Sequence, residues 1–311
     1  MIDELPEPAP TANEILVRVR AAALNRVDLG MSTGGAHGTN GGIGTTLGLE
    51  WAGEVVEVGE HVDRWRVGDR VMANGPGAFA EYAVTSASAV FSVPDALDWA
   101  QAAALPVGLQ TMHDALVARG GFVSGQSVLI QGATSAMGII GIQIARELGA
   151  SVVIGTTTSE QKVARIRQFG ADVALNSTRT AWVDRVLEVT DGTGVDVVLD
   201  LVAGELATDN LRATRIGGRI VNIGRVGGER VTFDLNLHSL RRITYVGTTF
   251  RTRTREEVAE VVREADKALG AAIAAGRVSI PVSATYPLAA AREALDAMAN
   301  NTHLGKLVLL P

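Results

Sequence analysis

The sequence contains no cysteine, and that absence removes several kinds of chemistry. Disulfide bonds, thiolate nucleophiles and thiolate metal ligands are all excluded. Long hydrophobic runs are also missing, because glycine or a charged residue interrupts each apolar stretch well before the roughly 20 residues that span a bilayer. Nothing at the start reads as a signal peptide, since Ile2, Asp3 and Glu4 lead into several prolines. We therefore expect a cytoplasmic location and no membrane partner.

An excess of positive charge is missing as well. The chain has 34 acidic and 28 basic side chains, a formal net charge of -6, which argues against nucleic acid as the main partner. With 47% hydrophobic and 20% charged residues, the composition is that of a folded globular protein. A length of 311 residues is enough for two domains with sizeable cores.

The first third of the chain predicts strands. Residues 14–22 alternate between apolar and polar side chains, and residues 51–62 and 69–73 form further short apolar runs punctuated by glycine. Residues 32–46 are dominated by Gly, Thr and Asn. We interpret them as a mobile surface loop, with an active-site lid as the alternative.

Beyond Ala100 the pattern changes to strands that alternate with helices. Strands that are apolar throughout indicate a parallel sheet covered on both faces. We expect such strands at residues 127–133, 151–157, 173–176, 195–202, 219–224 and 243–250. Helices are expected at residues 99–105, 109–118, 137–148, 159–169, 180–189, 205–214 and 255–275, followed by a strand after Ile280, a helix at 289–299 and a strand at 306–310.

A glycine-bearing turn follows the first of these apolar strands and opens a helix. Ala133, Ser135 and Gly138 hold the three small-residue positions of the G-x-G-x-x-G pattern. A single glycine makes the motif weak by itself, but the alternating strands and helices around it strengthen it. The segment predicts a dinucleotide diphosphate bound at the helix N-terminus; the alternative is another ligand at the same crevice. The residues expected to bind it are Gly132, Ala133, Thr134, Ser135, Ala136, Met137 and Gly138.

The end of the next strand indicates which dinucleotide is bound. NAD-specific folds place Asp or Glu there, whereas this chain has Thr157, Thr158 and Ser159, with Lys162 one turn into the helix. Hydroxyls and a lysine suit a 2′-phosphate, so the predicted cofactor is NADPH. Glu160 lies close by but is expected to point outward; the alternative for Lys162 is a solvated surface lysine.

Several segments together resemble the zinc-independent quinone oxidoreductases of the medium-chain dehydrogenase/reductase superfamily. They are AAALNRVDL, LGLEWAGEVVEVGEHVDRWRVGDRV, AAALPVGLQTMHDAL, the nucleotide segment and NNTHLGKLVLLP. The resemblance covers nearly the whole chain. It implies a GroES-like β-rich catalytic domain from residues 1–107 and 248–311, and a Rossmann doubly wound parallel-sheet domain at 108–247. It also implies a cleft between the domains and a homodimer joined through the last Rossmann strand.

The same comparison predicts that the chain binds no metal. Zinc-dependent relatives carry Gly-His-Glu, but the matching run here is Gly48-Leu49-Glu50, and leucine is no ligand. The five histidines show no ligand spacing such as H-x-x-x-H. The resemblance implies two departures from the relatives. We expect this chain to lack their opening strand, and Leu29-Gly30 follows the N-x-x-D motif where many bacterial members have a tyrosine.

Hydride transfer without a metal requires other groups to stabilise charge on the substrate oxygen. The candidate donors are Asn25 of the N-x-x-D motif and Gln110 and Thr111 of LPVGLQT. Asn25 has the alternative of capping a turn, and Thr111 of facing the core; for Asp28 we favour a structural role. Loops expected to approach the cofactor carry Gly224, Arg225, Phe250 and Arg251, with solvated charge as the alternative for both arginines.

These observations predict an NADPH-dependent oxidoreductase that transfers a hydride to a quinone or an α,β-unsaturated carbonyl without metal. A quinone or enone fits because it delocalises the charge that it accepts, and no side chain here stands out as a general acid. The alternative is a redox-silent NADPH-binding protein with a regulatory or structural role.

Overall fold

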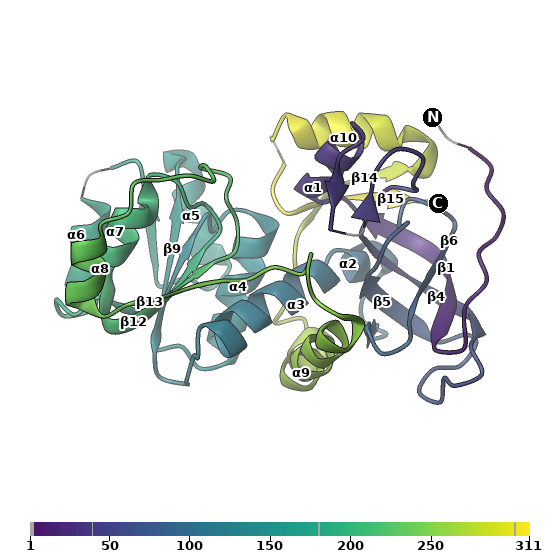
Figure 1. The fold of residues 1–311 in the computed structure, drawn as a ribbon, viewed down its shortest axis with the longest axis horizontal. Coiled ribbons are helices and arrows are strands. Elements are labelled where there is room, and N and C mark those ends of the chain that lie inside the picture. The colour runs from purple at the N-terminus through teal and green to yellow at the C-terminus, as the bar shows by residue number, and fades with distance from the viewer. Residues whose placement is uncertain (1–2, 39, 180, 302) are drawn as a thin grey trace. The chain divides into compact units, whose positions relative to one another are not determined.

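A computed structural model describes residues 3–38, 40–179, 181–301 and 303–311. The chain divides into two compact units, one formed by residues 1–110 and 250–311 and the other by residues 111–249 (Figure 1). Each unit is built on its own large sheet. The predicted fold class, a GroES-like domain with a Rossmann domain, is confirmed.

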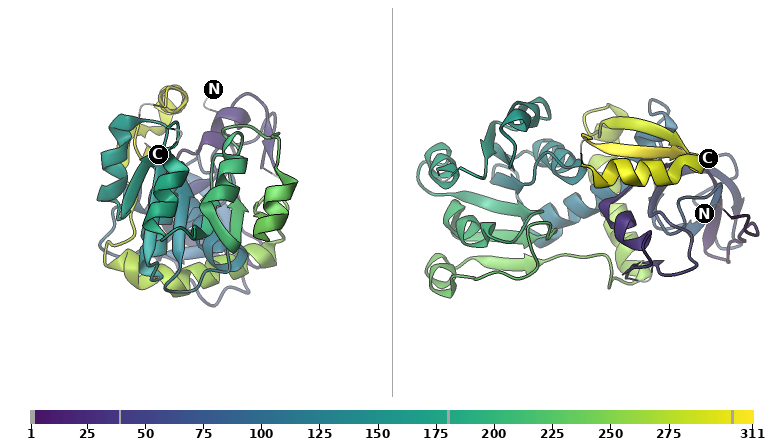
Figure 2. Two further views of the ribbon diagram at one scale, coloured as in Figure 1. Left: turned by 90° about the vertical axis from the view of Figure 1, so that its left-hand side faces the viewer. Right: turned by 90° about the horizontal axis from the view of Figure 1, so that it is seen from above.

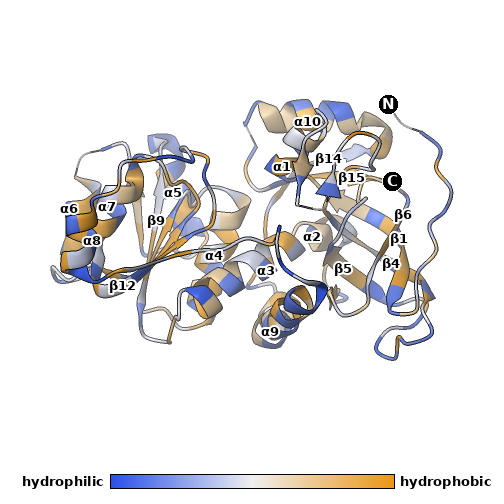
Figure 3. Ribbon diagram, viewed as in Figure 1, coloured by the Kyte–Doolittle hydropathy of each residue, from blue (hydrophilic) through white to orange (hydrophobic). Residues whose placement is uncertain are grey.

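The first unit contains a largely antiparallel sheet of seven strands. β1 (Glu14–Ala23) is central, because it pairs with β4, β6 and β15, and its alternating pattern buries Ile15, Val17 and Val19. Hydrophobic residues concentrate along these strands in Figure 3. The order is β14-β15-β1-β4-β5-β7, with β6 on β1. The strands are β4 Glu50–Val58, β5 Arg70–Asn74, β6 Tyr82–Ser86, β7 Val90–Ser92, β14 Val282–Pro287 and β15 Lys306–Leu310.

Short helices and one long helix accompany this sheet. The long helix, α9 (Arg255–Ala274), begins at Thr254, whose hydroxyl accepts a hydrogen bond from the Glu257 amide. The others are α1 Arg26–Met31, α2 Trp99–Ala103, α3 Pro106–His113, and α10 Ala291–Ala299 after the 3-10 turn Leu288–Ala290. Among the described residues, no helix is both long and apolar enough to cross a bilayer.

The second unit is a six-stranded parallel sheet in the order β10-β9-β8-β11-β12-β13, a doubly wound arrangement. Helices lie on both sides of its strands in the left view of Figure 2. The strands are β8 Ser127–Gln131, β9 Val152–Thr157, β10 Val173–Asn176, β11 Val195–Asp200, β12 Thr214–Asn222 and β13 Thr244–Gly247. The helices are α4 Ala136–Glu147, α5 Glu160–Gln168, α6 Trp182–Val189, α7 Leu206–Ala213 and α8 Leu235–Arg241.

Some local expectations were wrong. The helix expected at 109–118 ends at His113 and continues as π-helical turns over Asp114–Arg119, closed by the bond from the Gly120 amide to the Ala115 carbonyl. Helix α8 was not expected, because Leu235 and Leu240 are exposed and give no inward stripe. The expected loop at 32–46 contains a small hairpin of β2 (Ala36–His37) and β3 (Asn40–Gly41).

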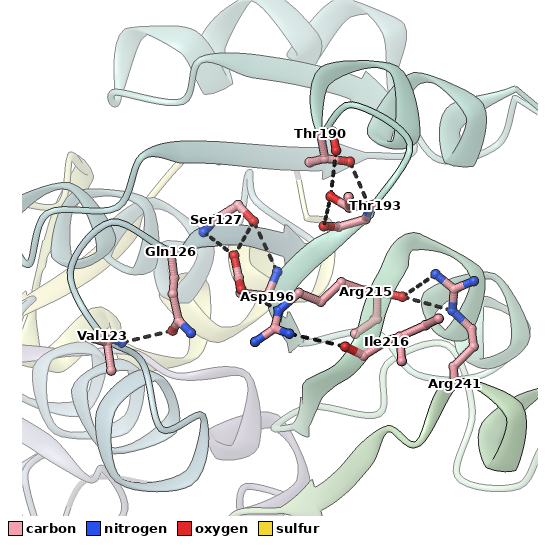
Figure 4. A network of polar contacts seen from close by, with 11 residues as sticks. Val123, Gln126, Ser127, Thr190, Thr193, Asp196, Arg215, Ile216 and Arg241 are labelled. Atoms are coloured by element: carbon pink, nitrogen blue, oxygen red, sulfur yellow. Dashed lines mark hydrogen bonds and ion pairs between the residues drawn. The ribbon is translucent and has the colours of Figure 1, made fainter.

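A polar network joins the amino-terminal ends of the parallel strands (Figure 4). Asp196 accepts hydrogen bonds from the amide and hydroxyl of Ser127, at 2.8 and 2.7 Å, and pairs with Arg215. The Arg241 guanidinium donates to the Thr214 carbonyl from two nitrogens, at 3.0 and 2.6 Å. These polar groups therefore satisfy one another at this edge of the sheet.

Candidate active site

The turn after β8 holds the backbone of α4 unusually close to that of the turn itself. A Cβ atom on Gly138 would lie 2.5 Å from the Ala133 Cα and 2.6 Å from the Gly132 carbonyl oxygen, so only glycine fits. Gly132 has a φ of +73°, which also favours glycine. Ser135 caps the helix: its hydroxyl accepts from the Gly138 amide at 3.0 Å and donates to the Gly132 carbonyl at 2.9 Å.

This geometry suits an anion. The amides of Ala136 and Met137 lie in the first turn of α4, where helix geometry provides no acceptor for them. Free amides and the positive end of the helix dipole favour a phosphate at this position. The small side chains of the turn leave room for the backbone to approach it, so the residues present fit a dinucleotide diphosphate.

A chain of buried side chains lies beneath the turn. The Thr156 hydroxyl donates to Gln131, whose amide donates to Asn210 at 2.7 Å, and Asn210 donates to Asp200 at 3.0 Å. Burial raises the pKa of the Asp200 carboxyl, although its hydrogen bonds oppose that shift. The other carboxyl oxygen accepts from the Ala203 amide at 2.8 Å. The network thereby ties the end of β9 to the loop after β11.

The loop after β12 packs against the loop after β11. A Cβ atom on Gly224 would lie 2.3 Å from the Leu201 carbonyl oxygen, and the Gly227 amide donates to the Val202 carbonyl at 2.8 Å. Val202 also lies 3.2 Å from the position of a Cβ atom on Gly132. The structure therefore brings Gly224 and the half-buried Arg225 to the same edge of the sheet as the glycine-bearing turn.

Hydroxyl groups cluster at the end of β9. The hydroxyl of the buried Thr157 lies 3.4 Å from that of Thr134 and accepts from the Ser159 amide at 3.3 Å. Thr158 is exposed, and Ser159 precedes α5, in whose first turn the half-buried Lys162 lies. These residues share one edge of the sheet with the turn at Gly132, as expected for residues that contact one cofactor.

Sequence reasoning missed residues at the end of the neighbouring strand, β10. Because β10 pairs with β9 in parallel, Asn176 lies opposite Thr157, and the Ser177 amide donates to the Thr157 carbonyl at 2.9 Å. Arg179 follows two residues later and forms an ion pair with Glu160. The parallel alternation of strands was the signal that could have found them, because it aligns consecutive strand ends.

In the first unit, a buried ion pair connects four segments of the chain. The Lys306 ammonium donates to Glu50, to the Asn25 side-chain oxygen at 2.7 Å and to the Leu24 carbonyl at 3.4 Å. The other Glu50 oxygen accepts from the Val107 amide, at the start of α3, at 2.6 Å. The side chains of Lys306 and Glu50 are only 3% and 0% exposed, so both charges are satisfied almost entirely inside the protein.

This network also engages the Asn25 amide. Its nitrogen donates to Glu50 at 3.0 Å and, more weakly, to the Ala23 carbonyl at 3.5 Å, while its oxygen accepts from Lys306. Asn25 is the residue before α1, as in the turn-capping alternative, and it has little capacity left for a substrate. Lys306 was missed, although a lone charge in the apolar segment KLVLL is an unusual feature for a strand.

Gln110 and Thr111 lie on helix α3, one turn beyond Val107. Gln110 is 1% exposed, and neither its amide oxygen nor its amide nitrogen has a hydrogen-bond partner among the described residues. A buried amide without a partner costs free energy, and a ligand group or water can remove that cost. Thr111 is half-buried. Of the three candidate donors, Gln110 is therefore the one that is fully buried with both polar atoms unpartnered among the described residues.

Phe250 and Arg251 belong to the first unit, whereas the glycine-bearing turn belongs to the second. The Arg253 guanidinium lies 4.6 Å from the centre of the Phe250 ring. A Cβ atom on Gly38 would lie 2.9 Å from the Arg251 carbonyl oxygen, so the β2–β3 hairpin packs against this loop. No local pattern around Gly38 or Arg251 indicates that contact.

Asp28 is the least solvated carboxyl of the α1 region. It is 0% exposed and accepts from the backbone N–H of Asn25 at 2.6 Å, but its other oxygen has no partner among the described residues. Burial raises its pKa to about 7; the Asn25 bond and Lys306 oppose the shift, and Glu50 adds to it. The structure thus supports a structural role for this carboxyl.

The donor set does not favour a metal ion. No group of three or more His, Cys, Asp or Glu side chains is placed to hold one within residues 3–38, 40–179, 181–301 and 303–311. Leu49 is buried, and both Glu50 oxygens already accept hydrogen bonds from Val107, Asn25 and Lys306.

Comparisons with known proteins identify the family of the chain. Residues 11–95 match the family described as an alcohol dehydrogenase GroES-like domain, and residues 136–267 match the zinc-binding dehydrogenase family. A quinone oxidoreductase of Sus scrofa is 30% identical over 308 residues, covering 97% of this chain and 91% of that protein.

Solved structures are similar over the same length. The Escherichia coli quinone oxidoreductase complexed with NADPH has a TM-score of 0.86 and 26% identity, covering 100% of this chain and 95% of that one. The CurK enoyl reductase has a TM-score of 0.85 and 26% identity, covering 99% of this chain and 94% of that one.

The buried carboxyl of Asp28 predicts a pH-dependent stability. Because its folded pKa is about 7 and its usual value 3.8, its neutral form is favoured in the folded chain. Its contribution is fully present below about pH 4 and is lost as the pH rises through 7. Asp28→Asn, which stays neutral, should raise the free energy of unfolding at pH 8 by on the order of 2–4 kcal/mol and change little at pH 4.

Thermal and urea unfolding of both proteins between pH 4 and 8 measures this difference. The exposed Asp63 provides a matched control, because Asp63→Asn should leave the pH dependence unchanged. A parallel pH profile for Asp28→Asn and the unaltered protein would contradict the assignment.

Proposed function

Because the chain belongs to the quinone oxidoreductase family of the medium-chain dehydrogenase/reductase superfamily, we propose that it is an NADPH-dependent oxidoreductase acting on a quinone or an α,β-unsaturated carbonyl without a metal. The observation that carries the proposal is the close approach of Gly138 to Gly132 and Ala133, which forms a cradle for a diphosphate. Support for the cofactor and the acceptor comes from the NADPH-bound Escherichia coli quinone oxidoreductase and the CurK enoyl reductase.

We assign the cofactor contacts to the edge of the parallel sheet. Gly132 to Gly138 hold the diphosphate, Thr157, Thr158, Ser159 and Lys162 hold the 2′-phosphate, and Gly224 and Arg225 face the nicotinamide end. From the family resemblance we also assign Phe250 and Arg251, which follow β13 in the sequence, to the cofactor contacts. When bound, NADPH supplies the hydride.

The chain's own part in the chemistry is to stabilise negative charge on the substrate oxygen. Gln110 is the preferred donor, because its buried amide nitrogen has no partner among the described residues and is already in place before the charge develops. Thr111, the next residue on α3, is the second donor. Asn25 is the third candidate and ranks last, because Glu50 and Lys306 already occupy its side-chain amide.

The absence of metal in the proposed reaction is supported by the chemistry of the side chains. The chain has no cysteine, and leucine occupies position 49 of the Gly48-Leu49-Glu50 run. The Lys306 ammonium already neutralises Glu50, so a metal ion would have to displace it. A quinone or enone fits such a site, because it needs less assistance from a Lewis acid than a simple ketone.

Steady-state oxidation of NADPH with a panel of quinones and enones tests the reaction. Gln110→Leu should lower kcat by roughly tenfold to a hundredfold and leave NADPH affinity unchanged, because it removes one donor to the developing oxyanion. The exposed Gln168→Leu should have no effect. Tight NADPH binding with no turnover of any acceptor would instead favour a redox-silent role, and full activity of Gln110→Leu would remove Gln110 from the mechanism.

Lys162→Ala tests the choice of cofactor. We expect NADPH binding to weaken by about tenfold and NADH binding to remain nearly constant, because only NADPH carries the 2′-phosphate. Titration of intrinsic or nicotinamide fluorescence measures both affinities. Lys267→Ala, an exposed lysine on α9, is the control. Equal losses for the two cofactors would refute the assigned role of Lys162.

We further propose that two copies pair through β13. It ends the sheet order, so among the described strands its outer edge has no partner, and Tyr245 on it is 37% exposed. Leu235 and Leu240 lie on α8, the helix before β13, and are 70% and 64% exposed, which is unusual for large apolar side chains. An edge strand can pair with its own copy across a two-fold axis, so a second copy satisfies both features.

Tyr245→Glu should convert a dimer into a monomer, because it places two like charges close to the two-fold axis. Sedimentation velocity at micromolar concentration measures the change. Leu5→Glu, at a 67% exposed position of the other unit, should not alter the mass. An unaltered chain that is monomeric at this concentration would disprove the pairing.

A further inference from the structure

An acidic side chain lies at the edge of the proposed 2′-phosphate site, and the structure shows how its charge is balanced. Glu160 is the first residue of α5. Three nitrogen atoms lie within hydrogen-bond or ion-pair distance of its Oε2 atom. They are the side-chain amide nitrogen of Asn176 at 3.0 Å and the Nε and Nη2 atoms of Arg179, both at 3.1 Å. The carboxylate is therefore directed toward the end of β10.

The residues that contact Glu160 are themselves held by the end of the sheet. The Asn176 oxygen accepts from the amide and the hydroxyl of Thr178, at 3.0 and 2.8 Å, which fixes the orientation of its amide. The Arg179 amide donates to the Asn176 carbonyl at 3.2 Å. Asn176 lies opposite Thr157 in the parallel register, so the cluster is tied to the strand end that carries the predicted phosphate ligands.

The balance of charge at this strand end depends on Arg179. Hydrogen bonds from Asn176 and Arg179, with the charge of Arg179, hold the pKa of the Glu160 carboxyl below its usual value, so it is ionised at neutral pH. With Arg179, the formal charges of Lys162, Arg179 and Glu160 sum to one positive charge; without it they cancel. A 2′-phosphate dianion responds strongly to that difference, whereas a ribose hydroxyl does not.

We propose that Arg179 is a specificity-determining residue, which neutralises Glu160 and so lets the end of β9 accept a 2′-phosphate next to an acidic side chain. The inference rests on the proposed use of NADPH. Both side chains are largely exposed, 62% for Glu160 and 70% for Arg179. Exposed ion pairs of this kind contribute little to stability. We therefore assign this pair an effect on the electrostatic potential at the proposed phosphate site.

The test uses the full chain with three variants: Arg179→Ala, Glu160→Gln and the double variant. Dissociation constants for NADPH and NADH are measured by fluorescence titration at low ionic strength, where charge effects are largest. Arg179→Ala should weaken NADPH binding by roughly fivefold and leave NADH binding unchanged. The double variant restores the net charge of the cluster, so it should bind NADPH as tightly as the unaltered chain, within about twofold.

Two controls separate this effect from a general one. Arg167→Ala removes the same charge from the last turn of α5 and should not change the preference for NADPH. Unfolding temperatures should be the same for all variants, because no buried contact is lost. Loss of the Arg179→Ala effect at high salt is also expected.

The outcomes also distinguish this inference from the proposed function. An unaltered chain that binds NADPH and NADH equally would overturn the proposed cofactor. If the unaltered chain prefers NADPH, an unchanged preference in Arg179→Ala would overturn the role of Arg179 alone. If the double variant loses as much NADPH affinity as Arg179→Ala alone, Arg179 contacts the phosphate itself. That result also overturns the neutralising role.

Discussion

The close packing of backbone against backbone at Gly138 is the constraint on which the second unit depends. The helix that starts there can lie against Gly132 and Ala133 only because no Cβ atom intervenes. That proximity aims the free amides of the first turn of α4 at the end of β8, and the same turn donates through the Ala133 amide to the Thr156 carbonyl at 2.8 Å. One steric requirement therefore creates a turn suited to an anion and fixes it to β9, the strand to which we assign the 2′-phosphate contacts.

The first unit uses charge in a different way. Lys306 and Glu50 are both buried, and each provides the other with the charged hydrogen-bond partner that takes the place of water. Removing one partner of such a pair typically costs about 3–5 kcal/mol, because the remaining charge stays buried without a counter-ion. The network joins β15, β4, α1 and the start of α3. It also occupies the side-chain amide of Asn25. For that reason our proposal places the substrate donors on α3, where Gln110 lies one turn beyond the Val107 amide that Glu50 binds.

How much could be predicted depended on whether a feature is local. Apolar strands and their glycine-terminated helices are local patterns, and the parallel sheet, β10 and β15 appeared where expected. The turn at Gly138 was predicted because all the small residues of its motif lie within the seven residues from Gly132 to Gly138. Lys306 and Glu50 are 256 residues apart, and no periodicity links them. Arg179 was missed for the same reason: its partner Glu160 lies on a different element, and only the register of β9 with β10 brings them together.

The two edges of the parallel sheet show why specificity can change without loss of the fold. At the amino-terminal edge, Asp196 accepts from Ser127 and Arg215 in partly buried contacts, so a substitution there disturbs the sheet itself. At the opposite edge, Thr158, Glu160 and Arg179 are exposed and hold little structure together. The charges of Glu160 and Arg179 act on whatever binds there, through water and over several ångströms. Because neither Glu160 nor Arg179 is needed for packing, the cofactor preference that we propose rests on residues that the fold leaves free to vary.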